Sequence, residues 1–199
     1  RQVVCVELSK RRSLVNAFRH RDRENIEIYV GNFEDIEPSL PQFDIVTLIG
    51  VLEYASSYLH TQEPYLQMLQ AAWRHLKPGG RLILAIENKL GMKYWAGCRE
   101  DHTGRLFDSI ESYPERCGVQ TFSKKELENL LQAAGYADLK FYYPYPDYKL
   151  PNAIYSDAYL PRKGTLTSNM RNFDQERLLL FDEAKAYSAV LDAGLFPDF

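Results

Sequence analysis

Short apolar runs and helical patterns alternate along the chain from its first residues. Four of the runs occupy residues 3–6, 26–30, 43–49 and 81–86. The run at residues 3–6 is continuous, which is typical of a strand buried on both faces of a parallel sheet. Helical spacing appears after Ser9 and again from about Pro64 to Leu76. The alternation predicts an α/β fold with a Rossmann-like, doubly wound and mostly parallel sheet, in which strand 81–86 lies near strand 43–49.

Two of the helices have recognisable ends or faces. Ser9 can cap the first helix. Its apolar side consists of Leu14, Ala17 and Phe18. The clearest helix spans residues 123–134, because Ser123 and Glu126 have the spacing of a capping box. Gly135 then stands where a left-handed residue commonly ends a helix.

The C-terminal third departs from the strand–helix alternation. Residues 139–146 ("LKFYYPYP") and 152–156 ("NAIYS") read as two strands with no helix between them, which predicts an antiparallel hairpin. Helical spacing returns from Asn172 to Gly194. We expect a single domain over residues 1–199, with residues 160–199 as a helical extension.

Composition and charge exclude several classes of partner. A chain of 199 residues with a net charge of -3 has no general attraction to nucleic acid. No apolar run approaches the roughly 20 residues that a membrane span needs. Cys5, Cys98 and Cys117 lack CxxC spacing and partnered histidines, so no metal site is expected. An odd number of cysteines suits a reducing cytoplasm.

Polar residues follow the carboxyl ends of the predicted strands, where open α/β sheets bind ligands. Glu7 ends the first strand and can accept two hydrogen bonds from a ribose diol; alternatively, it complements the dipole of the next helix. Asn32 can accept from the exocyclic amine of adenine, and the backbone N–H of Phe33 can donate to a ring nitrogen. The alternative is an ordinary turn at Gly31 and Asn32.

Two longer stretches indicate the class of protein. "FDIVTLIGVLEYA" and "LKPGGRLILAIEN" together resemble the class I S-adenosylmethionine-dependent methyltransferases. In that family an apolar strand, a "VLEY" stretch, a helix and a "LKPGG" turn precede the next strand. The resemblance covers roughly residues 3–143, and it implies S-adenosylmethionine as cofactor. The cofactor-binding residues that it implies are Glu7, Leu8, Asn32, Phe33, Ile49 and Gly50.

The resemblance also assigns a role to most of these residues. Glu7 would bind the ribose, and Asn32 and Phe33 would bind the adenine. Ile49 would offer its carbonyl to the methionine amino group. The family's glycine-rich loop is absent, and the sequence starts at Arg1 inside a strand. We therefore expect a fragment without the first strand, which binds the cofactor poorly and exposes strand edges that favour a homo-oligomer.

The most individual segments point to the acceptor. "ENKLGMKYWAGCREDHTG" and "FYYPYPDYKLP" resemble methyltransferase modules that accompany or are fused to glycosyltransferases of bacterial surface polysaccharides. This resemblance implies O-methylation of a saccharide or another small polar acceptor. It also implies a glycosyltransferase domain as partner, in the same polypeptide or pathway. Residues 87–122 would form the acceptor side of the domain.

A sugar hydroxyl is a weak nucleophile at neutral pH and benefits from a general base. His102 is the first candidate, and Asp101 or Glu100 is the candidate that orients it. The alternative is that "REDH" is a polar loop tied by local salt bridges. Glu87 is the second catalytic candidate, because it follows a strand whose carboxyl end faces the site.

Three residues near these acids are candidates for binding the acceptor. Asn88 follows the same strand end as Glu87, although both could cap a helix instead. Tyr94 and Trp95 could stack on a sugar ring, or they could belong to the core. The acceptor side therefore depends on geometry that the sequence leaves open.

Three other functions compete with saccharide methylation. The chain could methylate a small molecule of another class, or it could be a non-catalytic module that binds a glycan or a partner. A nicotinamide-dependent epimerase would need a Tyr-x-x-x-Lys pair on a helix. Tyr145 and Lys149 have this spacing, but their stretch is too rich in proline to form a regular helix.

Overall fold

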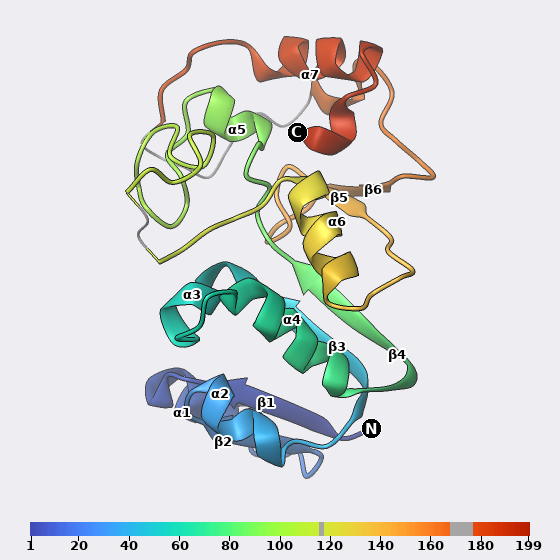
Figure 1. Cartoon of the computed structure of the whole chain (residues 1–199). Helices are drawn as coiled ribbons and strands as arrows, with labels where there is room; N and C mark the ends of the chain where they lie inside the picture. The colour runs from blue at the N-terminus through green and yellow to red at the C-terminus, as the bar shows by residue number, and fades with distance from the viewer. Residues whose placement is uncertain (116–117, 168–176) are drawn as a thin grey trace.

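The computed structural model describes residues 1–115, 118–167 and 177–199. Cys117 and the first residues of the helix predicted over 172–194 lie outside the described residues. Figure 1 shows two α/β units in the N-terminal half and a looser group of short elements beside the C-terminus. None of the helices in the described part of the chain is long and apolar enough to cross a membrane.

The first unit consists of two parallel strands and the helix between them. Strands β1 (Val3–Glu7) and β2 (Ile26–Val30) pair in register over their whole length. Helix α1 (Lys10–Arg19) connects them, and the Ser9 side chain accepts a hydrogen bond from a backbone N–H of its first turn, as predicted. Two short helical segments follow, α2 (Phe33–Ile36) and η1 (Glu37–Ser39).

The apolar side of α1 corrects an expectation from the sequence. Leu14 and Phe18 are 60% and 71% exposed, whereas the neighbouring Ser13 is buried. The Ser13 hydroxyl donates to the backbone carbonyl of Ser9, one turn earlier. A helical stripe of apolar residues is buried only where another element covers it, and none of the described elements does so here.

The second unit repeats the plan and forms the predicted parallel pair. Strand β3 (Phe43–Ile49) pairs with β4 (Leu76–Ala85), and a shift of register lies between Phe43 and Ile45. The strand therefore begins at Leu76, before the "KPGG" stretch that was expected to precede it. The connection holds η2 (Leu52–Tyr54), α3 (Ala55–Tyr58) and α4 (Pro64–Arg74).

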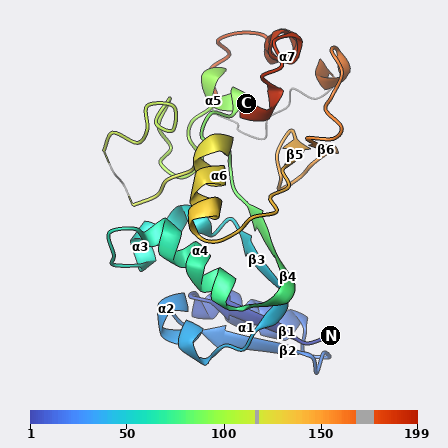
Figure 2. The same ribbon diagram turned by 45° about the vertical axis from the view of Figure 1, so that its right-hand side comes forward.

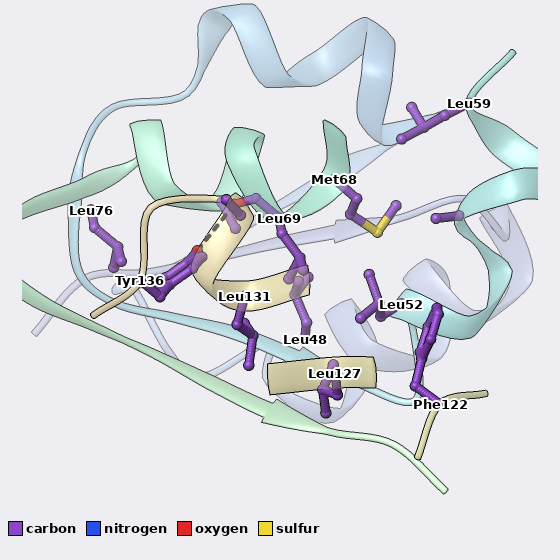
Figure 3. Packing of buried hydrophobic residues seen from close by; sticks show 13 residues of the cluster. Leu48, Leu52, Leu59, Met68, Leu69, Leu76, Phe122, Leu127, Leu131 and Tyr136 are labelled. Atoms are coloured by element: carbon purple, nitrogen blue, oxygen red, sulfur yellow. Dashed lines mark hydrogen bonds between the residues drawn. The ribbon is translucent and has the colours of Figure 1, made fainter. Parts of the chain in front are cut away.

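The main hydrophobic core lies between α4 and α6 (Lys124–Ala133) and the strands of the second unit (Figure 3). Leu52, Ala55 and Leu69 are completely buried there. The Tyr136 hydroxyl donates to the backbone carbonyl of Leu69 over 3.1 Å, which ties the end of α6 to α4. The capping box of α6 between Ser123 and Glu126 is present, as predicted.

The sheet is less continuous than the sequence suggested. The described strands form three two-stranded sheets: β1 with β2, β3 with β4, and the antiparallel pair β5 (Tyr142–Tyr145) with β6 (Ala153–Ser156). The mixed α/β class, the parallel pairs and the C-terminal antiparallel hairpin are thus confirmed. Within the described residues, β1 and β3 each have one edge without a partner strand.

The C-terminal elements are short. They are α5 (Met92–Trp95), η3 (Thr165–Thr167), α7 (Glu183–Asp192) and η4 (Phe196–Asp198). The described part of the helix predicted over 172–194 is therefore helical only in α7, which Asp182 caps. Figure 2 shows α5, α7 and the C-terminus gathered at the end of the molecule away from β1 and β2. This group surrounds the outer end of the site described next.

Candidate functional site

The residues predicted to bind a nucleoside meet at the ends of β1 and β2. The backbone N–H of Gly31 donates to the carbonyl of Glu7 over 3.2 Å, which joins the two strand ends. The Glu7 carboxylate accepts from the backbone N–H of Ser9 and from Arg12 over 2.7 and 2.8 Å. Both bonds are accepted by Oε1. Glu7 thus contacts the next helix, which the sequence offered as the alternative to ribose binding, and Oε2 is still available for a ribose hydroxyl.

Asn32 stands at the start of α2, but its side chain does not cap the helix. Its amide nitrogen donates over 3.4 Å to the backbone carbonyl of Tyr58, at the end of α3. The contact places the end of β2 beside the segment that follows β3. The carboxylate at the end of one strand and the amide carbonyl after the next are hydrogen-bond acceptors. They suit a ribose diol and an adenine amine, so these residues fit the expected nucleoside.

The other predicted cofactor residues are open to solvent or lie at the end of β3. Leu8 is exposed just beyond β1, and Ile49 is exposed at the last position of β3. The backbone N–H of Gly50 donates to the Ala85 carbonyl and so joins the ends of β3 and β4. Gly50 has a φ of +62°, and a Cβ there would meet the Tyr148 hydroxyl at 3.1 Å, so a larger residue would be strained and crowded.

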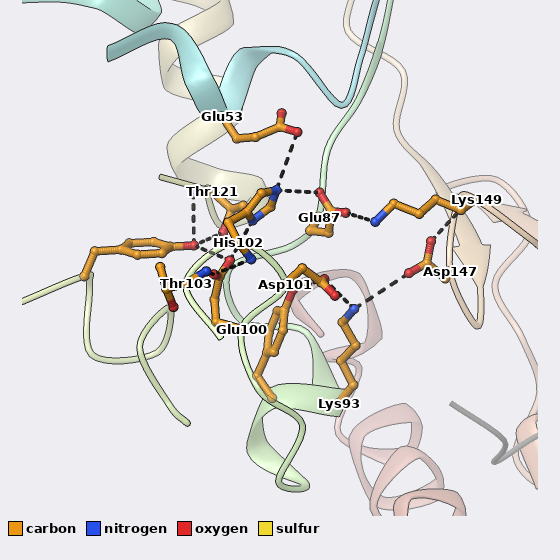
Figure 4. Close-up of polar contacts among 12 residues, drawn as sticks. Glu53, Glu87, Lys93, Glu100, Asp101, His102, Thr103, Thr121, Asp147 and Lys149 are labelled. Atoms are coloured by element: carbon orange, nitrogen blue, oxygen red, sulfur yellow. Dashed lines mark hydrogen bonds and ion pairs between the residues drawn. The ribbon is translucent and has the colours of Figure 1, made fainter. Parts of the chain in front are cut away.

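A buried polar cluster lies beyond the ends of β3 and β4 (Figure 4). Glu53 comes from η2, Glu87 follows β4, and His102 comes from the long segment 87–122. The Nε2 atom of His102 lies 3.7 Å from Glu53 Oε1 and 3.9 Å from Glu87 Oε2. All three side chains are at least nine-tenths buried. The tertiary structure thus brings together three ionisable groups from segments far apart in the sequence.

Glu100 orients the imidazole of His102. Its Oε1 lies 2.8 Å from the Nδ1 atom of His102, and its Oε2 accepts the backbone N–H groups of His102 and Thr103. The Tyr113 hydroxyl also donates to Glu100. Since Nδ1 faces a carboxylate, it carries a proton and Nε2 points toward Glu53 and Glu87.

Asp101 faces a different network. Its carboxylate accepts from Lys93 over 2.6 Å and from the Tyr94 hydroxyl over 2.7 Å. The sequence offered Asp101 or Glu100 as the residue that orients His102. In the structure, Glu100 is the acid that contacts the imidazole. Asp101 instead fixes α5 to the segment that carries His102.

The surroundings of His102 also set its charge. Burial alone would lower the pKa of the imidazole, but the bonds to Glu100 and Glu53 and the charge of Glu87 raise it to about 10. The imidazole is then protonated at neutral pH in this arrangement. A ring that already holds its proton cannot serve as a general base. The charge of His102 in this arrangement therefore opposes the role that the sequence suggested for it.

Sequence reasoning assigned no catalytic or binding role to Lys149 or Glu53. Lys149 donates to Glu87 Oε1 over 2.6 Å, from the loop between β5 and β6. The rule that ligands bind at strand ends does include Glu53, because it closely follows the carboxyl end of β3, as Glu87 follows that of β4. No local pattern indicates Lys149, since it reaches the cluster through a contact between residues that are far apart in the sequence.

A cavity of about 180 Å³ opens beside Glu87. Polar residues on its wall include Asn88, Lys93 and Asp147. Aromatic residues on its wall include Tyr143, Tyr145, Tyr148, Tyr187, Phe196 and Phe199. Its outer wall comes from β5, α7 and η4. His102 is not among the lining residues, so Glu87 is the member of the cluster that reaches the cavity.

The three residues predicted to bind the acceptor have different positions. Asn88 lines the cavity, and its side chain bonds to the backbone of Leu90 and Asp198. Tyr94 is 1% exposed, so it has the position that the sequence offered as the alternative, in the core. Trp95 is partly exposed beside Phe199, but it does not line the cavity.

Comparison with known proteins identifies the N-terminal part of the chain. Residues 1–82 match the family model of a methyltransferase domain. This segment contains β1, β2 and β3 with their carboxyl ends, and the first part of β4. The match agrees with the methyltransferase class that the sequence motifs indicated. A methyltransferase domain implies S-adenosylmethionine as the methyl donor.

The solved structures include a distant likeness. The crystal structure of a presumptive methyltransferase from Bacillus halodurans C-125 matches with a TM-score of 0.46 and 19% identity, over 72% of this chain and 57% of that chain. The chain thus spans little more than half of that protein, and a likeness at this TM-score does not bear on function. No curated protein matches the sequence.

Proposed function

We propose that the protein transfers a methyl group from S-adenosylmethionine to a hydroxyl oxygen of a saccharide. The observation that carries this proposal is the cavity beside Glu87, which adjoins the carboxyl end of β4. Aromatic rings and hydrogen-bonding side chains line it together. This combination suits a sugar, which presents C–H groups to rings and hydroxyls to polar atoms.

The size of the cavity also favours a small acceptor group. Pockets for drug-sized ligands measure roughly 300–1,000 Å³, whereas this one is about 180 Å³. It would hold a single sugar ring, such as the end of a glycan. A glycosyltransferase in the same polypeptide or pathway would supply such an acceptor, and we include this partner in the proposal.

Glu87 is placed to act on the acceptor hydroxyl. Its carboxylate lines the cavity, and Oε2 is a buried acceptor without a hydrogen-bond partner in the described structure. Lys149 holds Oε1 and thereby fixes the orientation of the carboxylate. An acceptor hydroxyl in the cavity can donate to the Glu87 carboxylate and pass its proton there as the oxygen attacks.

The methyl donor supplies an activated sulfonium, so the protein mainly positions the reacting groups. The acceptor oxygen forms a bond to the methyl carbon, the carbon–sulfur bond breaks, and its electron pair remains on sulfur. The proton of the hydroxyl goes to the Glu87 carboxylate. In this scheme His102 and Glu100 are positioning residues, since His102 does not line the cavity.

The test is a transfer assay with radiolabelled S-adenosylmethionine and a panel of acceptors. We expect label in mono- or oligosaccharides and not in phenols or amines. Glu87→Gln should reduce turnover roughly 10²–10⁴-fold, because it removes a general base and keeps the side-chain shape. Glu37→Gln, which changes a carboxylate far from the cavity, is the matched control and should stay active.

Three outcomes would contradict the proposal. Label in phenols or amines alone would indicate a methyltransferase for another class of acceptor. Tight saccharide binding without transfer would indicate a binding module that keeps the fold. Unchanged turnover in Glu87→Gln would leave the acceptor class standing but remove Glu87 as the base.

A further inference from the structure

Two carboxylate oxygens of the buried cluster lack a hydrogen-bond partner among the described residues. Glu53 Oε2 and Glu87 Oε2 are both inaccessible to solvent and accept no hydrogen bond from the described residues. The two side chains are only 2% and 4% exposed. A buried acceptor without a partner costs about 1–3 kcal/mol, and more when the group is charged. Such an arrangement calls for a group that is not part of the chain.

We propose that Glu53, Glu87 and His102 form a binding site for one divalent metal ion. Each residue offers one ligand atom, and the three atoms all lie within 4.8 Å of one another. Metal–ligand bonds of about 2.0–2.2 Å place ligand atoms roughly 3–3.5 Å apart. Small rotations of the side chains would therefore close the cluster around an ion.

The residues behind the ligands have the arrangement of a metal site. Ligating histidines usually donate their second ring N–H to a carboxylate, which fixes the ring and strengthens the ligand. Glu100 receives Nδ1 of His102 in this way over 2.8 Å and is itself held by two backbone N–H groups. Lys149 holds the other oxygen of Glu87. Two of the three ligands are thus already oriented toward a common point, and a bound ion would take the place of the proton on His102 Nε2.

The donor set favours a first-row transition metal. Carboxylates suit Mg²⁺, Ca²⁺ and Mn²⁺, whereas an imidazole suits Zn²⁺ and other transition metals. Two carboxylates with one imidazole are ligands that Mn²⁺ and Zn²⁺ both accept. Three protein ligands also leave positions open for water or an acceptor oxygen. The cysteine spacing that argued against a metal site concerned thiolate ligands, which this site does not use.

The ion would stand at the inner end of the acceptor cavity, because Glu87 belongs to both the cluster and the cavity wall. Bound there, it would polarise the acceptor hydroxyl and favour loss of its proton. Only this use in turnover rests on the proposed function. Binding of the ion itself does not, and it can be measured without methyl donor or acceptor.

The test is a titration of chelator-treated protein with Mn²⁺, in which electron paramagnetic resonance reports free Mn²⁺, and with Zn²⁺ in a calorimeter. We expect one site per chain and weaker binding of Mg²⁺. Glu53→Gln and Glu87→Gln should each weaken Mn²⁺ binding at least roughly tenfold. Glu37→Gln is the control: Glu37 also lies 2.8 Å from a histidine, His75, yet it belongs to no such cluster among the described residues.

A measurement on the unaltered protein keeps the test independent of the variants. Pulsed electron paramagnetic resonance of bound Mn²⁺ should show coupling to an imidazole nitrogen, which His102→Gln should abolish. Absence of a saturable Mn²⁺ or Zn²⁺ site below about 1 mM would overturn the inference. Binding that Glu53→Gln and Glu87→Gln leave intact, or that Glu37→Gln weakens equally, would overturn it as well. Metal binding without methyl transfer would sustain this inference and count against the proposed function alone.

Discussion

The two parallel units of the chain share one sequence plan but are packed differently. In the first unit, β1, α1 and β2 leave Leu14 and Phe18 largely exposed. In the second unit, α4 buries Leu69 completely between the strands and α6. Both helices have an apolar side, so the amphipathic pattern alone does not decide burial. The difference shows that a helix contributes a core only where a second layer covers its apolar face.

The same division separates the two halves of the site. Glu7 and Asn32, at the strand ends of the first unit, are partly exposed, and each keeps an acceptor oxygen that these bonds do not use. Glu53, Glu87 and His102, beyond the second unit, are buried and held by further residues. The residues expected to bind the nucleoside thus lie on the first unit, which has little buried core. The polar cluster lies beyond the second unit, which contains the main core.

The largest difference should come from truncating a leucine in each unit. Leu69→Ala should lower the free energy of unfolding by about 2–5 kcal/mol, because it opens a cavity in the core. Leu14→Ala, at a side chain that is 60% exposed, should change it by less than about 0.5 kcal/mol. Denaturant unfolding of both variants measures the contrast. Equal losses would show that the apolar side of α1 is covered in solution.

A second test concerns the nucleoside end of the first unit. Glu7→Ala should weaken binding of S-adenosylhomocysteine by about 1–3 kcal/mol, since a carboxylate–diol contact is charge-assisted. Calorimetry on the full-length protein measures the affinity, and NAD should not bind. Glu27→Ala, at an exposed acid within β2, is the control and should keep the affinity. Equal affinities of the unaltered protein and Glu7→Ala would remove Glu7 from the site.

The smallest effect concerns the start of α6 in the second unit. Burial would raise the pKa of Glu126, but hydrogen bonds from Lys89 and from Ser123 outweigh it and hold the pKa below its ordinary value. The stabilisation is therefore complete at neutral pH and is lost as the pH falls through the lowered pKa of the folded state.

Because Glu126 is 45% exposed, we expect this loss to stay below about 1 kcal/mol. Denaturant unfolding at pH 7 and at pH 3 should show a smaller pH dependence in Glu126→Gln than in the unaltered protein. Glu128→Gln, two residues further along the same helix, is the control. The same pH dependence in Glu126→Gln and in the unaltered protein would show that the capping box carries no such stabilisation.

Local patterns determined much of the fold from the sequence alone. The parallel pairs, the antiparallel hairpin and the capping box at Ser123 follow from residues within a few positions of one another, whose spacing fixes backbone geometry. The motifs around β3 and β4 also indicated the methyltransferase class. The rule that ligands bind at strand ends pointed to Glu7, Asn32 and Glu87.

Only the tertiary structure decided which of these residues meet. Glu53, Glu87 and His102 come from separate segments, and no spacing in the sequence encodes their distances. Adjacent residues diverge because neighbouring side chains in a loop point in different directions: Glu100 faces the imidazole, and Asp101 faces Lys93. Burial depends in the same way on what covers a residue in space, which is a property of the whole packed chain and not of its local pattern.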